Sequence, residues 1–560
     1  MTATPLWFGA ADRPLLGWLH APPDGARARG GVVICPPVGN ELAHSHYSLR
    51  LLAGALAAEG LVAVRFDYPG TGDSSGDHTD PGQVAGWLAA IDEAAQLVRS
   101  TGVRDVAAVG LRLGATLAAT AAARSGTFSA LLLWDPFGSG KAFMREQRAR
   151  LAVAVSEGSR SESDEVEIPG HLFTAETAAD VRALEIAGPV SNLAPRILVL
   201  TDPSRPRDAG LKERLADAEW QEYIERRAVL DTGELEFDPP RAIVAQAASW
   251  LSATFPAERV RLTLPAPTTV ATVGEDGHGG PLVEETVSIG PAGLFGIATQ
   301  APAQASPGPA ILLLSVAGEP RSGPARQWTE LARRWATEGY KVVRFDLSGI
   351  GDSPPRPGKR ERIPYAPEAL DDLADAAKAV SPDDPSNVML VGLCSGASAA
   401  LAAAPRLRPR RVVAVNPLLI LPAFHMLPAG PHPGRKRRAG YLPRFLQGLG
   451  WRFVYGMHPD YSPRRILRPL VEAGVPTFLV CGEGEAQPLK GRFHGRVRRL
   501  VSPKDLTLVV VPGLDHSLLV RSSREAVARL ITRHLEQAYP PPQAARSRQS
   551  VAPASPAALR

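Results

Sequence analysis

Short, almost wholly apolar runs recur along the chain, separated by longer segments in which apolar and polar residues mix. In the first part of the chain these runs predict buried strands at Gly31–Cys35, Val62–Phe66, Val106–Val109, Ala130–Trp134 and Ile197–Leu200. Helices are predicted between and after them, at about 47–59 and 82–100, from Ala115 onward, and over Pro240–Phe255. Apolar strands that alternate with helices are typical of a mostly parallel, doubly wound sheet, so the predicted fold class is α/β.

The same order of elements returns in the second part of the chain. Apolar strands are predicted at Ile311–Leu314, Asn387–Val391, Thr477–Val480 and Leu506–Val511, and a last helix at Ser523–Ala538. The motif Arg-Phe-Asp-Tyr-Pro-Gly-Thr-Gly-Asp-Ser (65–74) recurs as Arg-Phe-Asp-Leu-Ser-Gly-Ile-Gly-Asp-Ser (344–353), 279 residues later. A Gly-Leu-x-x-Gly motif at 110–114 recurs at 392–396. This repetition predicts two copies of one domain in tandem.

Composition suggests where the copies begin and end. We predict a first copy at 1–255, a Pro/Gly/Thr-rich linker at 256–283, a second copy at 284–538 and a disordered tail at 539–560. Each copy carries an insert, at about 135–193 and 417–473. We expect these inserts to cap the carboxyl ends of the strands, where ligands bind in open α/β sheets.

The motif at 391–398, Val-Gly-Leu-Cys-Ser-Gly-Ala-Ser, has the spacing of a nucleophile elbow with Cys394 at its apex. An apolar strand leads into it and a small-residue helix leads out. Gly392 and Gly396 are expected because side chains two positions either side of the apex would clash in so tight a turn. The apex then lies at a helix N-terminus, which favours a thiolate and offers N–H groups to an oxyanion. The alternative is that Cys394 is a small buried hydrophobe, as most free cysteines are.

A carboxylate and a histidine follow Cys394 in the order nucleophile, acid, histidine, which is that of α/β-hydrolases. His516, in the loop after the last strand, is predicted to take the thiol proton and later to activate water or another acceptor. Glu485 is predicted to orient the imidazole. Glu483 is the alternative acid, and Asp515 is too close to His516 in sequence to orient it.

The oxyanion hole is predicted to use the backbone N–H of Ser395 and a second N–H from the loop after Ile311–Leu314, that of Ala317. The hydroxyls of Ser395 and Ser398 are alternative nucleophiles. They rank below Cys394 because the glycine spacing places the cysteine at the apex.

The first copy lacks this chemistry. Its apex residue is Arg112, which stays charged and is no nucleophile. The sequence has no histidine between 171 and 278, so the loop after the strand predicted at Ala228–Leu230 carries none. Asp202 lies near the expected position of the acid, without partners. Arg112 either forms a structural ion pair or binds an anionic group in a retained pocket. His44 and His46 are read as loop residues that could line that pocket, and no third metal ligand accompanies them.

Length and charge limit the remaining function classes. At 560 residues the chain exceeds one ordinary core, and its net charge is +5. Two basic stretches, 435–438 and 492–504, lack interleaved aromatics, which argues against nucleic-acid binding and leaves contact with a carrier-bound or CoA-bound acyl donor as an alternative. No segment has the roughly 18 consecutive apolar residues of a membrane span. No signal peptide, cofactor fingerprint or metal site is predicted. Three cysteines suit a reducing cytoplasm.

Both copies resemble α/β-hydrolases, and more narrowly the two exosortase A system-associated hydrolases. The first copy is similar to the second type through Gly-Leu-Arg-Leu-Gly-Ala (110–115), Leu-Trp-Asp-Pro (133–136) and Val-Glu-Ile-Pro-Gly-His-Leu (166–172). The second copy is similar to the first type, whose elbow reads Gly-Leu-Cys-Asp, although this chain has Ser395 after the cysteine. The resemblance implies acyl-transfer chemistry at Cys394, in exopolysaccharide-linked or secondary-metabolite biosynthesis, and does not fix a substrate.

Two functions follow as hypotheses. In the first, the second copy is an enzyme that forms an acyl-cysteine from a small acyl substrate and passes the acyl group to water, an amine or a hydroxyl. In the second, the chain is a non-catalytic scaffold. In both, the two copies would form an intramolecular pseudo-dimer.

Overall fold

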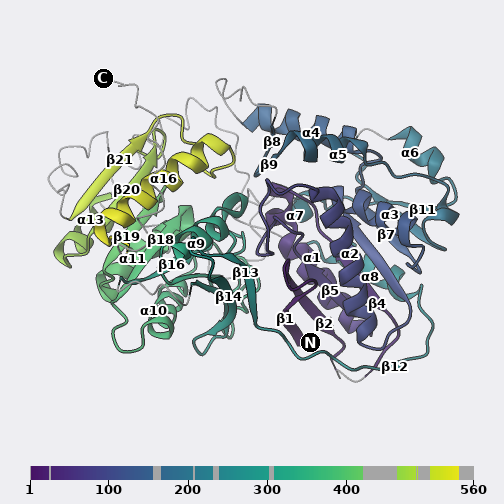
Figure 1. Cartoon of the computed structure of the whole chain (residues 1–560), viewed down its shortest axis with the longest axis horizontal. Helices are drawn as coiled ribbons and strands as arrows, with labels where there is room; N and C mark the ends of the chain where they lie inside the picture. The colour runs from purple at the N-terminus through teal and green to yellow at the C-terminus, as the bar shows by residue number, and fades with distance from the viewer. Residues whose placement is uncertain are drawn as a thin grey trace, which may run out of the picture.

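The computed structural model describes residues 2–23, 27–154, 165–205, 208–230, 239–301, 308–419, 463–486, 489 and 505–541. Within these residues the strands form two large sheets, one of eight strands and one of nine. We call residues 2–269 the first half and residues 270–541 the second half. The two halves lie beside each other in Figure 1, the first in purple and blue, the second in teal to yellow.

The first sheet has the order β1-β2-β5-β4-β6-β7-β10-β11. Its strands are β1 (Thr2–Phe8), β2 (Leu15–Ala21), β4 (Gly31–Cys35), β5 (Val62–Phe66), β6 (Val106–Leu111), β7 (Leu131–Trp134), β10 (Ile197–Thr201) and β11 (Glu219–Glu222). The first two strands are antiparallel, and pairing is parallel from β5 onward. The central strands are buried on both faces, which explains why they are apolar throughout.

Helices cover both faces of this sheet. One core layer packs α2 (Gln83–Ser100) and α3 (Leu113–Ser125) on the sheet, and the other packs α1 (Asn40–Ala58) and α8 (Arg241–Ser252). The first predicted insert is built from α4 (Gly140–Ala154), the hairpin β8 (Val166–Ile168) and β9 (His171–Phe173), α5 (Ala175–Ala183) and the 3-10 turn η1 (Val190–Asn192). Short elements complete this half: β3 (Arg27–Ala28), α6 (Ala209–Arg214), α7 (Arg226–Leu230) and β12 (Val260–Arg261).

The second sheet repeats the strand order of the first, with one strand more at its antiparallel edge: β13-β14-β15-β17-β16-β18-β19-β20-β21. Its strands are β13 (Val270–Glu275), β14 (Pro281–Ile289), β15 (Leu294–Gln300), β16 (Ala310–Leu314), β17 (Val342–Phe345), β18 (Val388–Leu393), β19 (Arg411–Val415), β20 (Thr477–Gly482) and β21 (Leu506–Val511). One face carries α10 (Ala369–Val380), α11 (Cys394–Leu407) and α13 (Pro463–Glu472), and the other carries α9 (Gln327–Thr337), after the 3-10 turn η3 (Pro324–Arg326), and α16 (Arg521–Ala538).

The mostly parallel α/β class is confirmed, and two local predictions are wrong. His44 and His46 lie in helix α1, which begins at Asn40, and not in a loop. Ala228–Leu230 belongs to helix α7, and the last strand of the first sheet is β11. The range 256–283, which we predict as a linker, holds β12, β13 and the first residues of β14, and its assignment as a linker stays a prediction.

Several predictions lie outside the described residues: both basic stretches, most of the second insert, and the tail from residue 542. The domain boundaries themselves stay a prediction. Among the described helices, none combines the length and the apolar character needed to cross a membrane.

The repeated motif at 65–74 and 344–353 forms a reciprocal part of the contact between the two halves. Arg65 of the first half donates to Asp352 of the second at 2.7 Å, and Arg344 of the second half donates to Asp73 of the first at 3.0 Å. All four side chains are at least nine-tenths buried. Each motif therefore supplies its arginine to the aspartate of the other.

Candidate active site

Cys394 lies at the turn between β18 and α11, with a positive φ of 52°. A Cβ added to Gly392 would lie 2.4 Å from the carbonyl carbon of Gly396, and one added to Gly396 would lie 2.7 Å from the Ser315 oxygen. Real Cβ atoms do not approach backbone so closely, so the predicted reason for both glycines is confirmed. A non-glycine residue at positive φ is strained, and such strain is concentrated at functional sites.

The predicted nucleophile, base and acid lie together. His516 Nε2 is 3.2 Å from Cys394 Sγ, and His516 Nδ1 is 3.0 Å from Glu485 Oε1. The three residues come from the turn after β18, the loop after β21 and the turn after β20, which all open at the carboxyl edge of the sheet. Glu483, the alternative acid, is exposed to solvent.

Hydrogen bonds set the protonation of this group. The contact with Cys394, and next the contact with Glu485, raises the pKa of His516 to about 10. The hydrogen bond from His516 lowers the pKa of Glu485 below its ordinary value. The imidazole is thus held as a cation between the Glu485 carboxylate and the Cys394 sulfur at neutral pH.

Asn416, which sequence reasoning missed, connects the two loops that carry the acid and the histidine. It follows β19 directly, has a φ of 44° and is fully buried. Its amide nitrogen donates to the backbone oxygens of Asp515 and His516, at 3.3 and 3.1 Å, and its oxygen accepts the Gly482 N–H at 2.8 Å. No sequence motif marks this residue, because its role depends on three strand ends meeting in space.

The Asp515 carboxylate forms hydrogen bonds within its own loop. Its carboxylate accepts the N–H groups of Leu519 and Val520, at 2.7 and 3.4 Å. These bonds close the turn that leads from His516 into α16.

The two residues predicted to supply the oxyanion donors, Ala317 and Ser395, are hydrogen-bonded to each other. Ala317, at a positive φ of 48°, donates its N–H to the hydroxyl of Ser395 at 2.7 Å. Ser395 lies in the first turn of α11, where helix N–H groups have no intrahelical acceptor. Ser398 bonds the backbone at Cys394 and Leu418. Both alternative nucleophiles are thus engaged in local hydrogen bonds.

Tyr365 is a second residue that the sequence did not reveal. Its hydroxyl lies 3.5 Å from Cys394 Sγ, and burial raises its pKa above the ordinary value, so that it stays protonated. It belongs to the irregular segment before α10, which has no motif. A protonated phenol beside the sulfur can donate a hydrogen bond to it.

In the first half Arg112 occupies the corresponding turn, at a φ of 58°. It is fully buried, and its guanidinium forms ion pairs with Glu41 at 3.1 Å, Asp135 at 3.0 Å, and Glu146. These carboxylates raise the pKa of Arg112 above its ordinary value. The contacts match the ion-pair interpretation of Arg112.

The other candidates of the first half do not join Arg112. His44 bonds Asn40 and the Leu230 oxygen, both at 3.1 Å. His46 points to the second half, where it lies 3.2 Å from Asp352. Asp202, predicted to lack partners, forms an ion pair with Arg226 at 3.3 Å. The structure therefore spreads the predicted pocket residues over separate contacts.

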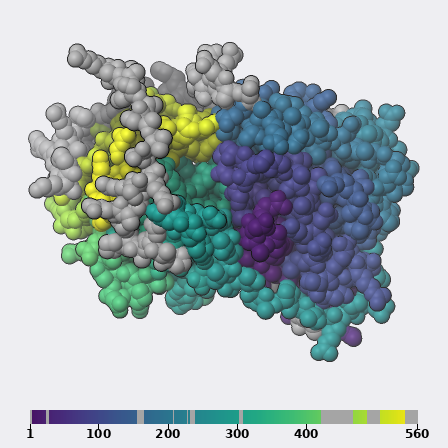
Figure 2. Space-filling model, in the orientation of Figure 1, coloured from purple at the N-terminus to yellow at the C-terminus, as the bar shows by residue number. Residues whose placement is uncertain are grey.

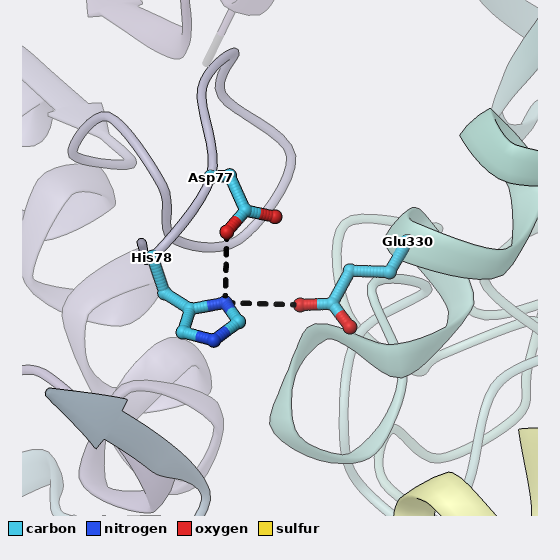
Figure 3. Close-up of side chains that lie close together, drawn as sticks. All are labelled: Asp77, His78 and Glu330. Atoms are coloured by element: carbon cyan, nitrogen blue, oxygen red, sulfur yellow. Dashed lines mark ion pairs between the residues drawn. The ribbon is translucent and has the colours of Figure 1, made fainter. Parts of the chain in front are cut away.

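One group of described side chains has metal-ligand geometry: Asp77, His78 and Glu330, whose ligand atoms lie within 4.8 Å of one another. Figure 3 shows that the first two come from the first half and Glu330 from a helix of the second. His78 Nδ1 is 3.2 Å from Asp77 and 3.8 Å from Glu330. The Glu330 carboxylate already interacts with the guanidinium groups of Arg326 and Arg524, and these positive charges oppose the binding of a divalent cation. We assign the group to the contact between the halves.

The two remaining cysteines differ from Cys394. Cys35 and Cys481 are fully buried at strand ends, and burial raises the pKa of both, that of Cys481 to about 12. All three cysteines are free thiols.

Residues 311–530 match the model of the alpha/beta hydrolase family. The second half therefore contains an alpha/beta hydrolase domain, and the turn at Cys394 lies inside the matched range. Among the curated proteins none matches the chain.

Solved structures resemble a little under half of the chain. Est1E from Butyrivibrio proteoclasticus is 14% identical, with 45% of this chain and 98% of that chain covered and a TM-score of 0.34. The alpha/beta hydrolase GrgF from Penicillium sp. sh18 is 17% identical, with 46% and 98% covered and a TM-score of 0.31. The Pyrococcus furiosus esterase Pf2001 is 18% identical, with 45% and 92% covered and a TM-score of 0.30.

Proposed function

We propose that the chain is an acyl-transfer enzyme whose second half forms an acyl-Cys394 intermediate. The observation that carries the proposal is the continuous contact from the Cys394 sulfur through the His516 imidazole to the Glu485 carboxylate. A cysteine, a cationic imidazole and a carboxylate that orients it form the set needed for nucleophilic catalysis on an ester or thioester.

In the first step the Cys394 thiolate attacks the acyl carbonyl carbon, and a C–S bond forms. The leaving alcohol or thiol departs with a proton from His516, which becomes the neutral base. Water or another acceptor then gives its proton to His516 and attacks the thioester, which breaks the C–S bond. Glu485 holds the imidazole throughout.

The oxyanion would be held by the N–H groups of Ser395 and Ala317. The Ala317 N–H is engaged by the Ser395 hydroxyl at 2.7 Å, so the substrate oxygen must displace that hydroxyl. A serine after the nucleophile, rather than the aspartate of the resembled family, leaves a neutral rotatable group that can move away. Tyr365 adds a donor close to the sulfur.

The substrate we propose is a small acyl ester or thioester, either free or bound to CoA or a carrier protein, in exopolysaccharide-linked or secondary-metabolite biosynthesis. The resemblance of the elbow motifs supports the biosynthetic setting. Three free thiols support a reducing compartment, the cytoplasm. The two halves are proposed to act as an intramolecular pseudo-dimer of which only the second half is catalytic.

Intact-mass measurement tests the acyl-cysteine. Wild type and Cys394→Ala are exposed briefly to a panel of acyl thioesters and activated esters. A mass gain in wild type alone is expected, and amines or alcohols added afterwards separate transfer from hydrolysis. An equal gain in both proteins, or none in either with every donor, contradicts the proposal.

A non-catalytic scaffold is the second candidate, favoured by the ion pairs that fill the elbow of the first half. Iodoacetamide at neutral pH distinguishes the two. Rapid alkylation of Cys394 supports the enzyme, whereas a rate equal to that of the buried Cys35 and Cys481 supports the scaffold.

A further inference from the structure

The first half reaches the proposed site of the second half at two separate loops. One is the loop after β16, residues 315–323, which carries Ala317. The other is the loop 512–520, which carries His516. Figure 2 shows the region of the second contact, near the top of the view, where the blue surface of the first half meets the yellow surface of α16.

Asp73 holds the first of these loops. Its carboxylate accepts from Arg321 at 2.8 Å, and both side chains are 3% exposed. Arg321 also binds Asp346 at 2.9 Å and Asp352 at 3.0 Å, from the motif that follows β17. Arg321 is four residues from Ala317 in the same loop, so a carboxylate of the other half helps to hold the segment that carries the Ala317 N–H.

The hairpin β8–β9 holds the second loop. Its Gly170 N–H donates to the Leu519 oxygen at 3.3 Å. Glu167 of the same hairpin accepts the backbone N–H of Arg521, the first residue of α16, and lies 3.9 Å from the Arg524 guanidinium. The Arg521 guanidinium forms an ion pair with Glu165. Arg524 in turn donates to the Leu519 oxygen at 2.6 Å. A carboxylate at a helix N-terminus is favourable because free N–H groups and the helix dipole meet it there.

We propose that the first half is a positioning subunit for the site at Cys394. Through Asp73 it sets the loop that carries the Ala317 N–H, and through Glu167 it sets the loop that carries His516. This inference rests on the proposed function and assigns the catalytically inert half a part in it. Asp73 and Glu167 are positioning residues, because neither touches the sulfur or the imidazole.

The two contacts act on different steps, which allows a test in the full chain. Acyl transfer needs the oxyanion donors, whereas alkylation by iodoacetamide needs an activated sulfur and forms no oxyanion. We therefore expect Asp73→Asn to lower kcat for acyl transfer by roughly 10-fold to 100-fold at nearly unchanged KM, since small misplacements of catalytic groups have such effects. Its iodoacetamide rate should stay within about twofold of wild type.

Glu167→Ala should lower both the alkylation rate and kcat, by about 5-fold, because the histidine that activates the sulfur moves. Glu167→Gln keeps an acceptor for the Arg521 N–H and should restore most of the loss. Arg50→Gln is the matched control, since it breaks an ion pair between the halves, that of Arg50 with Glu361 at 3.1 Å, which belongs to neither loop. It should leave both rates unchanged.

Wild-type rates in folded Asp73→Asn and Glu167→Ala overturn the inference and leave the proposed function intact. Equal losses in Arg50→Gln also overturn it, because any loosening of the halves would then suffice. If Asp73→Asn fails to fold, the two Glu167 variants decide by their alkylation rates alone. If wild type accepts no acyl donor, the proposed function fails, while the alkylation rates still report whether Glu167 sets the His516 loop.

Discussion

The two elbow turns of the molecule have the same backbone and opposite chemistry. Arg112 and Cys394 both follow a central buried strand, both have a positive φ, of 58° and 52°, and both are flanked by glycines that the backbone approaches closely. Arg112 is sealed among carboxylates, whereas Cys394 is partly exposed beside an imidazole. The strained turn is thus a property of the fold, and it persists whether its apex is an arginine or a cysteine.

The residues after the neighbouring strands extend the comparison. Asp135 follows β7 and Asn416 follows β19, at φ values of 47° and 44°. Asp135 binds Arg112 and Arg205, at 3.0 and 2.6 Å, and so belongs to a network of charged side chains. Asn416 instead bonds backbone groups only and leaves the histidine free to face the sulfur. At the matching position, Asp135 joins a network of ion pairs in the first half, whereas Asn416 positions a loop in the second.

The largest expected effect comes from removing the proposed nucleophile, Cys394. Cys394→Ala should lower acyl-transfer turnover by about 10³-fold or more, as loss of a nucleophile does in other enzymes. Its free energy of unfolding should change by less than about 1 kcal/mol, because the side chain is small and partly exposed. Steady-state kinetics and urea denaturation measure both. Cys35→Ala, at a buried strand end of the first half, is the control for loss of any thiol; equal activity in the two variants would contradict the assignment.

The reverse result is expected at the other elbow. Arg112→Ala removes the fully buried cation between Glu41 and Asp135, which keep the more exposed Arg150 and Arg205, so the free energy of unfolding should fall by about 3–5 kcal/mol. Urea denaturation of the full chain, followed by tryptophan fluorescence, tests this. A loss below about 1 kcal/mol would show that Arg112 is not the centre of a buried network and would reopen its role as a ligand site.

How far the sequence predicts these sites depends on the range of the interactions. The elbow at 391–398, and the order of Glu485 and His516, follow from local spacing and were predicted. Asn416, Tyr365 and the exchanged Arg–Asp pairs act across distant segments, so no local pattern reveals them.

The wrong local predictions have similar causes. The first turns of α1 hold histidine and serine, which are weak helix formers, so its start at Asn40 gave little signal. A three-residue apolar run such as 228–230 does not distinguish helix from strand. The true last strand of the first sheet, Glu219–Glu222, has three polar residues in four and therefore lacks the apolar pattern.

Asn416→Asp converts the second half toward the first at one position. The change removes the donor to the Asp515 and His516 oxygens, and we expect kcat to fall roughly 10-fold at nearly unchanged KM through misplacement of His516. Asp135→Asn is the matched variant in the first half and should leave kcat unchanged while lowering stability. Kinetics of both variants give the answer; a wild-type kcat in Asn416→Asp would show that His516 does not depend on this contact.

The pH dependence of kcat/KM tests the roles of His516 and Glu485 in the second half. His516 has a pKa of about 10, so it keeps the proton that the leaving group needs up to that pH. As pH rises through about 10, kcat/KM for a substrate with a poor leaving group should fall. In Glu485→Gln, which removes one of the partners that raise this pKa, the fall should begin at lower pH. An unchanged profile in that variant would contradict the role of Glu485.

The smallest effect concerns Glu319, in the loop that carries Ala317. Burial raises its pKa from 4.5 to about 7, whereas the matching position past β4 holds the neutral Asn40. The folded state binds the proton of this carboxyl more tightly than the unfolded state does. The resulting contribution to the free energy of unfolding is fully present below the unfolded pKa and is lost as pH rises through about 7. Glu319→Gln should therefore stabilise the chain by about 1 kcal/mol at pH 8 and by less at pH 5. Denaturation midpoints at both pH values measure this; equal shifts would contradict it.

The exchanged ion pairs between Arg65 and Asp352, and between Arg344 and Asp73, have a consequence for how such a chain can change. A surface that offers both an arginine and its aspartate is self-complementary, as in isologous dimers. Covalent linkage makes the association independent of concentration. The elbow of one half can then differ from that of the other without loosening the assembly, because the residues that join the halves in these pairs are not those of the elbows.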